Sequence, residues 1–388
     1  MNRWMLDPDV VHLNHGSFGA CPLEVLEEQQ KWRTAMEQNP VRFMMTELQP
    51  ALDQSRRQLA EFVGADTAGL VFVPNATAGI NSVLWSMEPQ LGPGDEILVT
   101  DHTYNACRNV AEVAALRSGA TLVEVAAPFP LRSAEDVVMA VLDRICPSTR
   151  LVIVDAVTSP TAIVIPLSKL IDQLEPAVPV LVDAAHAPGM IELDLSTLGA
   201  SFVVGNCHKW MCAPKGAGFL YVAESRRDTI IPTTVSHGWN TESPTGGSRF
   251  HNLFDWAGTD DPSARLSVPA AIAAVGSMHD DGWSGVMAGN RHKVLEGREI
   301  ICSVLGLPLT VPAAAIGSMA TVELPGPQSA GASGDLDPLT DKLRDNWSIE
   351  VPVFIWRDWP HRLLRISAQL YNSQGDYERL AEALHAEL

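Results

Sequence analysis

Basic residues, long apolar runs and paired cysteines are all scarce in this sequence. Its 388 residues include 27 Lys and Arg against 46 Asp and Glu, so the formal net charge is −19. An acidic surface disfavours nucleic acid and anionic membranes as partners. No apolar run reaches the roughly 18 residues of a transmembrane helix. No basic segment followed by an apolar stretch opens the chain, so we expect no signal peptide and no membrane partner.

The cysteines show no pattern of metal ligands or disulfide pairs. Cys207 and Cys212 are five residues apart, but no second cysteine pair accompanies them. This spacing favours buried free thiols over a zinc site, so we predict no metal. The scattered thiols and the absent signal peptide together predict a cytoplasmic protein. A hydrophobic content of 46% is ample for a globular core.

Strand-like and helix-like segments alternate through the middle of the chain. Strands are predicted at "EILVT" (96–100), "TLVEVA" (121–126), "TRLVIVDAV" (149–157), "VPVLVDAA" (178–185), "SFVVG" (201–205) and "GAGFLYVA" (216–223). Helical patterns lie between the first four, as in the segment that ends at Gly119. This alternation predicts βαβ units around a mostly parallel sheet. The strands are apolar on both faces, as expected when helices cover both sides.

The pattern changes after about residue 260. Long helices are predicted over 261–278 and 283–306, and strands at "SMATVELP" (318–325) and "EVPVFIWRD" (350–358), followed by "RLLRISAQLYN". We therefore predict an N-terminal segment (1–30) that packs on two domains, a large α/β domain (31–258) and a smaller α+β domain (259–388).

Polar side chains follow two of the predicted strands where each strand ends. Asp183 ends "PVLVD" and His186 lies in the next turn, while Asn206, His208 and Lys209 follow "SFVVG". Ligands of open α/β sheets bind beyond the carboxyl ends of the strands. We therefore expect an acid, imidazoles and a lysine to meet at one edge of the sheet.

Two further segments are expected at the same edge. The small-residue turn Ala76, Thr77 and Ala78 follows "GLVFVPN" and opens a helix, and His102 and Tyr104 follow "EILVTD". Each of these residues has an ordinary structural explanation alone, such as a turn cap, a core histidine or a helix N-cap. Their joint occurrence at one edge is what indicates a site.

One ligand uses all of these groups together. A helix N-terminus binds phosphate through free N–H groups and its dipole. A desolvated lysine amine forms a Schiff base with an aldehyde. A buried carboxylate keeps a pyridinium nitrogen protonated. The set therefore predicts pyridoxal 5'-phosphate, whose protonated ring is an electron sink.

Several motifs carry a resemblance to a known family. "DAAHAPG" followed by "GNCHKW" resembles the class V aminotransferases, which are fold-type I pyridoxal-phosphate enzymes. "LNHGSFGACP", "DHTYNA", "WAGTDD" and "LLRISAQLYN" are similar to the isopenicillin N epimerase-like branch, which also contains C–S lyases of the ergothioneine-pathway kind. The resemblance covers nearly the whole chain. It implies a large domain with a mostly parallel sheet and a smaller α+β C-terminal domain.

The resemblance also implies roles for single residues. Lys209 is the expected Schiff-base lysine, with Lys215 in "PKGAGF" as its weaker competitor. Asp183 is expected to pair with the pyridinium nitrogen and His186 to hydrogen-bond the ring oxygen. Trp210 is expected to serve packing. The phosphate is expected to contact Ala76, Thr77, Ala78, Asn206 and His208.

Further roles concern the partner subunit and the substrate. Gly258 and Thr259 of "WAGTDD" are expected to reach the phosphate of a neighbouring subunit, which implies a homodimer with shared sites. Either His102 or Tyr104 is expected to stack on the cofactor and to act as an acid. Arg365 is expected to clamp the carboxylate of an amino-acid substrate. Other expected substrate contacts are Asn14, His15 and His237, the last in the polar loop 234–252 that we expect to line the entrance.

The reaction itself stays open between several outcomes. Residues 303–388 contain no cysteine, and the segment "GPQSAGASGD" (326–335) offers only Ser and Gly, which argues against a persulfide-forming desulfurase. The favoured prediction is a β-eliminating C–S lyase acting on a cysteine S-conjugate or its sulfoxide, with an amino-acid epimerase as the alternative. Transamination is a further possibility. A catalytically inactive regulator is disfavoured by the intact set of Lys209, Asp183 and Arg365.

Overall fold

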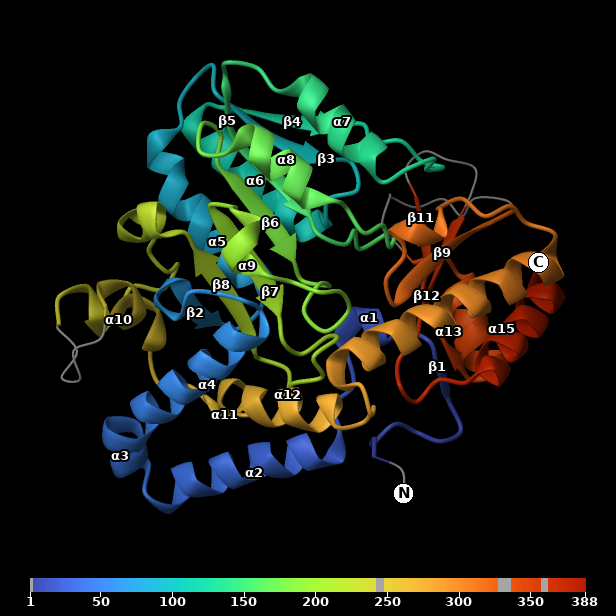
Figure 1. Ribbon diagram of the computed structural model, residues 1–388, viewed down its shortest axis with the longest axis horizontal. Coiled ribbons are helices and arrows are strands. Elements are labelled where there is room, and N and C mark those ends of the chain that lie inside the picture. Colours follow the sequence, from blue (N-terminus) through green and yellow to red (C-terminus); the bar gives the residue numbers. More distant parts are fainter. Residues whose placement is uncertain (1–2, 242–247, 327–335, 357–361) are drawn as a thin grey trace.

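The computed structural model describes residues 3–241, 248–326, 336–356 and 362–388. A large α/β part lies beside a smaller α+β part, and the N-terminal helices lie along one edge of the large part (Figure 1). This arrangement confirms the predicted α/β class. In the described residues, every helix is too short or too polar to span a bilayer.

A seven-stranded, mostly parallel sheet forms the centre of the large part. Among the described strands of this sheet, β8 (Gly218–Val222) alone is antiparallel to its neighbours, which are β2 (Leu70–Val73) and β7 (Phe202–Asn206). The remaining neighbours are parallel. The strands, in their order across the sheet, are β2 (Leu70–Val73), β8 (Gly218–Val222), β7 (Phe202–Asn206), β6 (Val180–Ala184), β5 (Thr149–Asp155), β3 (Glu96–Thr100) and β4 (Thr121–Val125).

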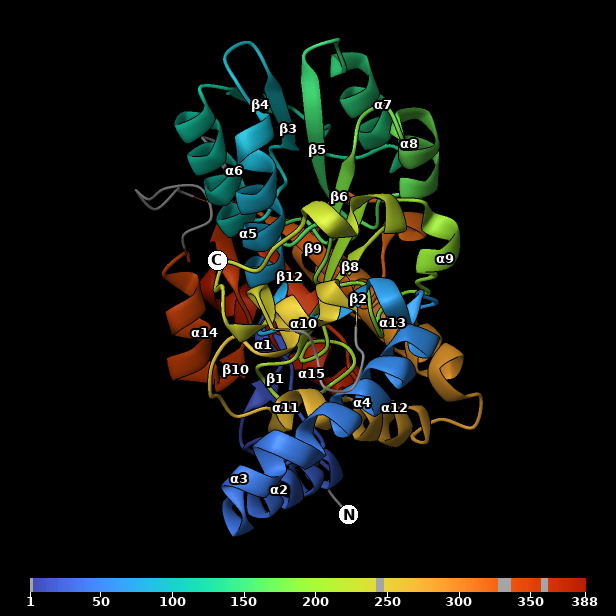
Figure 2. The ribbon, with the colours of Figure 1, turned by 90° about the vertical axis from the view of Figure 1, so that its left-hand side faces the viewer.

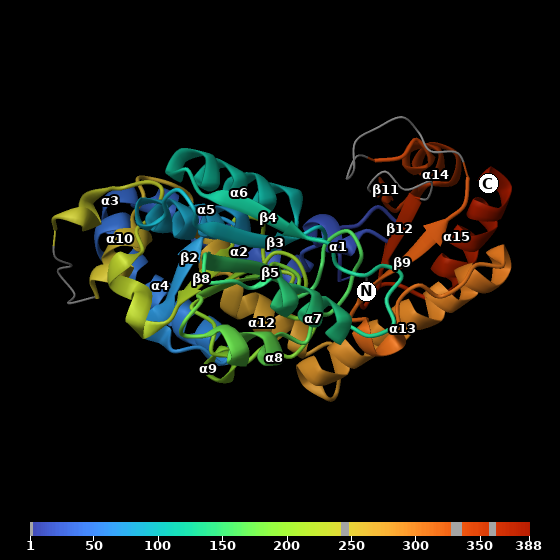
Figure 3. The same ribbon diagram turned by 90° about the horizontal axis from the view of Figure 1, so that it is seen from above.

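Helices cover both faces of this sheet (Figures 2 and 3). Along β5, Val152 and Val154 pack into one core, while Leu151 and Ile153 pack into the other. Residues 151–154 of β5 are all apolar because both faces of the strand are covered. One face is covered by α5 (Ala76–Met87) and α6 (Asn105–Ser118), and the other by α7 (Glu135–Arg144), α8 (Leu167–Leu174) and α9 (Leu195–Leu198).

The N-terminal helices pack against helices that follow the sheet in sequence. The contacts join α2 (Leu23–Gln38) and α4 (Leu48–Phe62) to α11 (Ser263–Leu266) and α12 (Val268–Gly276). The predicted single helix over 261–278 is therefore wrong, because it is two helices. The interruption falls at Ser267, and Pro269 lies in the first turn of α12, where a missing N–H costs nothing.

The smaller part is a three-stranded antiparallel sheet backed by helices. Its strand order is β11 (Val353–Ile355), β12 (Arg362–Ser367) and β9 (Met319–Leu324). The helices are α13 (Gly282–Leu305), α14 (Leu339–Trp347) and α15 (Gln374–Glu387), and α13 packs on both α15 and β9. The predicted strand over 350–358 is shorter than expected. It is divided between β10 (Ile349–Glu350) and β11, with Pro352 between them, and its last two residues lie outside the described ones.

The N-terminal segment joins the two parts. Strand β1 (Val11–His12) pairs in parallel with β10 of the smaller part. The following helix α1 (His15–Phe18) ends at Gly19, whose φ is +69°. A Cβ at Gly19 would lie 2.0 Å from the His208 carbonyl oxygen, so only glycine allows this close approach to the loop after β7.

Candidate active site

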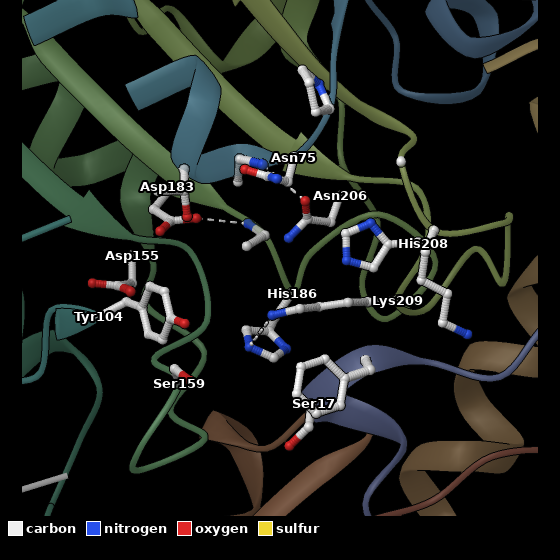
Figure 4. Close-up of a pocket in the computed structure, with 17 residues that line it drawn as sticks. Ser17, Asn75, Tyr104, Asp155, Ser159, Asp183, His186, Asn206, His208 and Lys209 are labelled. Carbon is white, nitrogen blue, oxygen red and sulfur yellow. Dashed lines mark hydrogen bonds between the residues drawn. The ribbon is translucent and has the colours of Figure 1, made fainter. Parts of the chain in front are cut away.

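A cavity of about 380 Å³ lies at the carboxyl ends of β5, β6 and β7. Figure 4 shows the side chains that surround it. A volume of this size is typical of sites for small organic ligands. The lining residues are Ser17, Phe18, Pro74, Asn75, Ala76, Thr77, Tyr104, Asp155, Ser159, Asp183, Ala185, His186, Asn206, His208, Lys209, Lys215 and Gly216.

Lys209 enters the cavity from the loop after β7. Its Nζ lies 3.0 Å from Nε2 of His186. Burial, and then the charge of Arg365, lower the pKa of Lys209 to about 8, against the opposing effect of Asp183. A lysine with this pKa is unprotonated far more often than a surface lysine, so it can act as a nucleophile or a base near neutral pH.

Asp183 and Asp155 place two buried carboxyl groups side by side. They are paired in register at the ends of β6 and β5, and each is 3% exposed. Asp183 accepts hydrogen bonds from Sγ of Cys107 at 3.1 Å and from the amide of Ala185 at 2.9 Å. Oδ2 of Asp155 has no partner in the described part of the chain. Burial and the charge of Asp183 raise the pKa of Asp155 well above its ordinary value, so the Asp155 carboxyl group is favoured in the neutral form.

The N-terminus of α5 points its first amides at the cavity. The amide of Ala76 donates to Oδ1 of Asn206 at 2.9 Å, and the amide of Ala78 donates to Oδ1 of Asn75 at 3.0 Å. The amide and hydroxyl of Thr77 have no partner among the described residues. Of the three predicted phosphate contacts in this turn, Thr77 is therefore the one left with free donors.

His208 lies at the same end of the cavity but has little capacity to donate there. Its Nδ1 donates to the carbonyl of Ala217 at 3.2 Å. Burial lowers the pKa of His208 to about 4, so the ring carries one proton and its other nitrogen is an acceptor.

Arg365, in β12 of the smaller part, does not itself line the cavity but contacts two serines that do. Its Nη1 donates to the carbonyl of Ser159 at 2.7 Å and its Nη2 to Oγ of Ser17 at 2.9 Å. Burial lowers its pKa to about 10. In the described residues, no carboxylate lies within ion-pair distance of this guanidinium, which is 2% exposed. A buried cation without an anion is a strong site for a ligand carboxylate.

Sequence comparison assigns the chain to a family. The profile of the class V aminotransferases matches residues 18–275 of the chain. The chain belongs to the class V aminotransferase family. Enzymes of this family use pyridoxal 5'-phosphate, and the resemblance of the "DAAHAPG" and "GNCHKW" motifs is thereby confirmed.

Two relatives match this chain over nearly its whole length. An isopenicillin N epimerase of Amycolatopsis lactamdurans is 35% identical over 98% of this chain and 95% of its own. A putative L-cysteine desulfhydrase of rice, Oryza sativa subsp. japonica, is 32% identical over 97% of this chain and 83% of its own.

Solved structures support the fold of the class V chain. The cystine C–S lyase C-DES, in complex with cysteine persulfide, matches with a TM-score of 0.79 at 22% identity, over 97% of both chains. The cysteine desulfurase CsdA of Escherichia coli matches with a TM-score of 0.78 at 19% identity, over 99% of this chain and 96% of its own. At these identities the likeness establishes the fold alone.

The residues of this class V site fit the family cofactor. Lys209 supplies an amine of lowered pKa, and Asp183 supplies a buried carboxylate with two donors of its own. Thr77 supplies free donors at a helix N-terminus. The unpartnered oxygen of Asp155 shows that the polar groups of the cavity are not all satisfied by the protein itself.

The structure separates the two candidates for the stacking residue. Tyr104 lines the cavity, whereas His102 does not. His102 is buried, with Nδ1 2.7 Å from Oγ1 of Thr161, and its ring packs at an angle against Phe129 and Trp356. The turn between β3 and α6 directs the two side chains apart, so only Tyr104 remains a candidate for contact with a bound ring.

The other predicted substrate contacts lie behind the cavity wall or outside it. His15 is fully buried and its Nε2 lies 3.0 Å from the carbonyl oxygen of Lys209, so it supports the lysine loop. Oδ1 of Asn14 accepts from the Ser17 hydroxyl at 2.6 Å, which orients Ser17 toward Arg365. His237 is exposed in a short helix, η5 (His237–Trp239).

Three more residues were predicted to belong to the site, namely Lys215, Gly258 and Thr259. Lys215 lines the cavity but is exposed, and its Nζ donates to the carbonyl of Gly19 at 2.9 Å. Gly258 and Thr259 do not line the cavity of their own chain. Gly258 has a φ of +123° with open space around it, and Thr259 is exposed. Residues 242–247 of the expected entrance loop lie outside the described residues.

Residue-by-residue inspection of the sequence did not single out Asp155, Ser159 and Ser17. Asp155 ends a predicted strand, so the rule that led to Asp183 could also have found it. Ser159 follows the same strand. Ser17 lies inside the quoted "LNHGSFGACP" motif, but nothing in that motif shows that its hydroxyl contacts an arginine far away in the sequence.

Proposed function

We propose that this class V enzyme cleaves the C–S bond at the β-carbon of a cysteine S-conjugate or its sulfoxide. The observation that carries the proposal is a buried lysine of lowered pKa in a cavity whose lining residues Ser17 and Ser159 hydrogen-bond a buried arginine that has no ion-pair partner in the described residues. Relatives named L-cysteine desulfhydrase and the absence of cysteine from residues 303–388 also support it. The products are a thiol or sulfenate, pyruvate and ammonia.

Lys209 acts as the base in this proposal. Its amine, held 3.0 Å from His186, removes the α-proton of the substrate. When bound, the protonated pyridine ring of the cofactor supplies an electron sink for the pair left on the α-carbon. The C–S bond then breaks and the sulfur takes the bonding pair. The released aminoacrylate is hydrolysed by water to pyruvate and ammonia.

Tyr104 is the proposed acid for the leaving sulfur. Burial raises its pKa above the ordinary value, and the charge of Asp183 raises it further. Its hydroxyl therefore keeps its proton at neutral pH. In Figure 4 the ring of Tyr104 and the amine of Lys209 enter the cavity from different sides. One acid and one base suffice for β-elimination.

Arg365 positions the substrate in this proposal, and its replacement is a first prediction. Lysine at this position should lower kcat/KM by about 10²-fold or more, because an ammonium cannot reproduce the planar fork that pairs with a carboxylate. Steady-state kinetics with a cysteine S-conjugate measure the effect. Arg362→Lys is the matched control, since Arg362 lies in the same strand and pairs with Asp337. Equal losses in both variants would contradict the assignment.

Elimination is favoured over epimerisation because three of the histidines expected near the site do not line the cavity. A second base or acid must act on the opposite face of the α-carbon in an epimerase. Of the histidines expected near the site, His15, His102 and His237 do not line the cavity, and His186 and His208 do. Burial lowers the pKa of His186 well below its usual range, so it is a poor second acid.

A panel of amino acids tests the reaction. Purified protein should release pyruvate and ammonia from at least one cysteine S-conjugate or sulfoxide, in equal amounts, with no change in the optical purity of the remaining substrate. L-Alanine and other amino acids without a β-leaving group serve as controls. Inversion of configuration at the α-carbon, with no pyruvate from any member of the panel, would contradict the elimination proposal.

Epimerisation remains the second candidate because of Tyr104. A protonated phenol at the cavity wall could return a proton to the α-carbon from the side away from Lys209. A relative that is 35% identical is named isopenicillin N epimerase. Tyr104→Phe should abolish inversion if this candidate is correct, and should only slow elimination if the first proposal is correct.

We further propose that the enzyme is a homodimer with shared sites. Gly258 and Thr259 leave their own cavity and are available to a second copy of the chain. We expect that mixing an inactive Lys209→Ala chain with an impaired Thr259→Ala chain restores part of the activity, because one site in each mixed dimer is then intact. Activity of purified mixed dimers is the measurement. A mixed dimer no more active than its parents would count against sharing.

We also propose a cytoplasmic location. All six cysteines of the class V chain are free. Unpaired thiols are typical of proteins kept in a reducing compartment.

A further inference from the structure

The indole of Trp210 contacts the histidine that contacts the reactive lysine. Trp210 is fully buried, and its Nε1 lies 3.2 Å from Nδ1 of His186. Nε2 of the same ring lies 3.0 Å from Nζ of Lys209. Gly189 permits this approach, since its φ is +85° and a Cβ there would lie 2.7 Å from the Trp210 carbonyl. The indole, the imidazole and the amine thus form one chain of contacts.

The chemistry of these groups dictates the direction of each hydrogen bond. An indole nitrogen can only donate, so Nδ1 of His186 accepts. Burial lowers the pKa of His186 well below its usual range, and the bond from the indole leaves Nδ1 without a proton, so the ring carries a single proton. That proton must lie on Nε2. Nε2 therefore donates toward Nζ of Lys209, and an amine nitrogen can accept only when it is unprotonated.

We propose that Trp210 is a positioning residue that keeps Lys209 in its unprotonated form by holding His186 as the Nε2–H tautomer. A protonated Lys209 would set two N–H groups against each other. Relieving this clash requires moving the His186 proton to Nδ1, which breaks the bond from Trp210. The proposal deepens the proposed function and rests on it, because it supplies a reason why Lys209 is ready to react.

Other charged groups also act on Lys209. Arg365 disfavours its protonation, whereas Asp183 favours it, and Cys107 and Asp155 would favour it only in their ionised forms. His208 and His15 act on His186 from the neighbouring loops. Trp210→Phe leaves the identity of all these groups unchanged, so it tests the indole N–H separately. Trp283→Phe is the matched control, because its Nε1 donates to the carbonyl of Ile272 at 2.9 Å, far along the chain in α13.

The tautomer of His186 is the first measurement. Nitrogen NMR of ¹⁵N-histidine in the full-length protein distinguishes Nε2–H from Nδ1–H rings, and His186→Gln identifies the signals. We expect Nε2–H in the wild type and in Trp283→Phe, with Nδ1–H appearing in Trp210→Phe. An Nδ1–H or doubly protonated His186 in the wild type would overturn the proposal, even if Trp210→Phe does not fold.

The pH dependence of cofactor capture is the second measurement. The full chain is stripped of cofactor, and the rate at which pyridoxal 5'-phosphate adds to it is followed by visible absorbance from pH 6 to 10. We expect the midpoint of the rate profile to rise by about one pH unit in Trp210→Phe, because protonation of Lys209 is no longer opposed. Trp283→Phe should keep the wild-type midpoint.

The two measurements distinguish a failure of the Trp210 proposal from a failure of the proposed function. Normal capture with an unchanged midpoint in Trp210→Phe would overturn the role of Trp210 and leave the proposed function intact. Absence of capture at Lys209 in the wild type would contradict the proposed function. The tautomer spectrum involves neither substrate nor cofactor, so it decides the Trp210 proposal in that case as well.

Discussion

Replacing Lys209 with alanine is expected to lower turnover by at least about 10⁴-fold, because the change removes both the amine that captures the cofactor and the base that takes the α-proton. Lys209 lies in the cavity, where burial and then the charge of Arg365 lower its pKa to about 8, and its Nζ lies 3.0 Å from Nε2 of His186. Steady-state kinetics and loss of the visible absorbance of the lysine-bound cofactor measure the two effects separately.

Lys215→Ala is the control for this prediction. Lys215 is exposed and donates to the carbonyl of Gly19, so we expect it to retain most of the activity. Borohydride reduction of the wild type followed by peptide mapping should place the pyridoxyl group on the peptide that contains Lys209. The group on Lys215, or an active Lys209→Ala enzyme, would end the assignment.

Asp183→Asn should raise the barrier by about 3–4 kcal/mol, a loss of about 10²–10³-fold in kcat, while the protein still binds cofactor. The carboxylate of Asp183 is buried and held by Cys107 and Ala185, so it can stabilise a protonated pyridine nitrogen without reorganising. An amide of the same shape has no charge with which to do so. The measurement is kcat at cofactor saturation, together with the dissociation constant of the cofactor.

Asp155→Asn is the matched control because Asp155 lies in register beside Asp183. Burial and the neighbouring charge raise the pKa of Asp155, so its carboxyl group is favoured in the neutral form. Replacing a neutral carboxyl group with a neutral amide should change kcat by less than about tenfold. A larger loss of kcat in Asp155→Asn than in Asp183→Asn would contradict this assignment, because Asp155 would then be the carboxylate that acts on the cofactor.

The strands of the large part and the edge that holds the site could be predicted from the sequence because most of these strands contain a continuous apolar run. Strand β3, for instance, spans the predicted residues 96–100. The residues that follow such strands, including Asp183 and Lys209, then converge by the topology of a parallel sheet. The division of the helix over 261–278 was harder to foresee, since the proline that marks it is also accepted in a first helical turn.

The contacts between distant segments could not be predicted in this way. Arg365 lies in a different sheet from Lys209, and only the family resemblance pointed to it. The choice between His102 and Tyr104 depended on a turn in which Thr103 bonds back to Thr100. Trp210 was expected only to pack, because an indole N–H that contacts a histidine 24 residues earlier leaves no local pattern.

The fate of the α-carbon in heavy water tests the proposed elimination most directly. The enzyme is incubated in deuterium oxide with the best substrate of the cysteine S-conjugate panel, and the products are followed by proton NMR and chiral analysis. Elimination predicts pyruvate that carries deuterium in its methyl group, one equivalent of ammonia, and residual substrate of unchanged configuration. Deuterium at the α-carbon of an inverted amino acid, with no pyruvate, would contradict the account and establish epimerisation in its place.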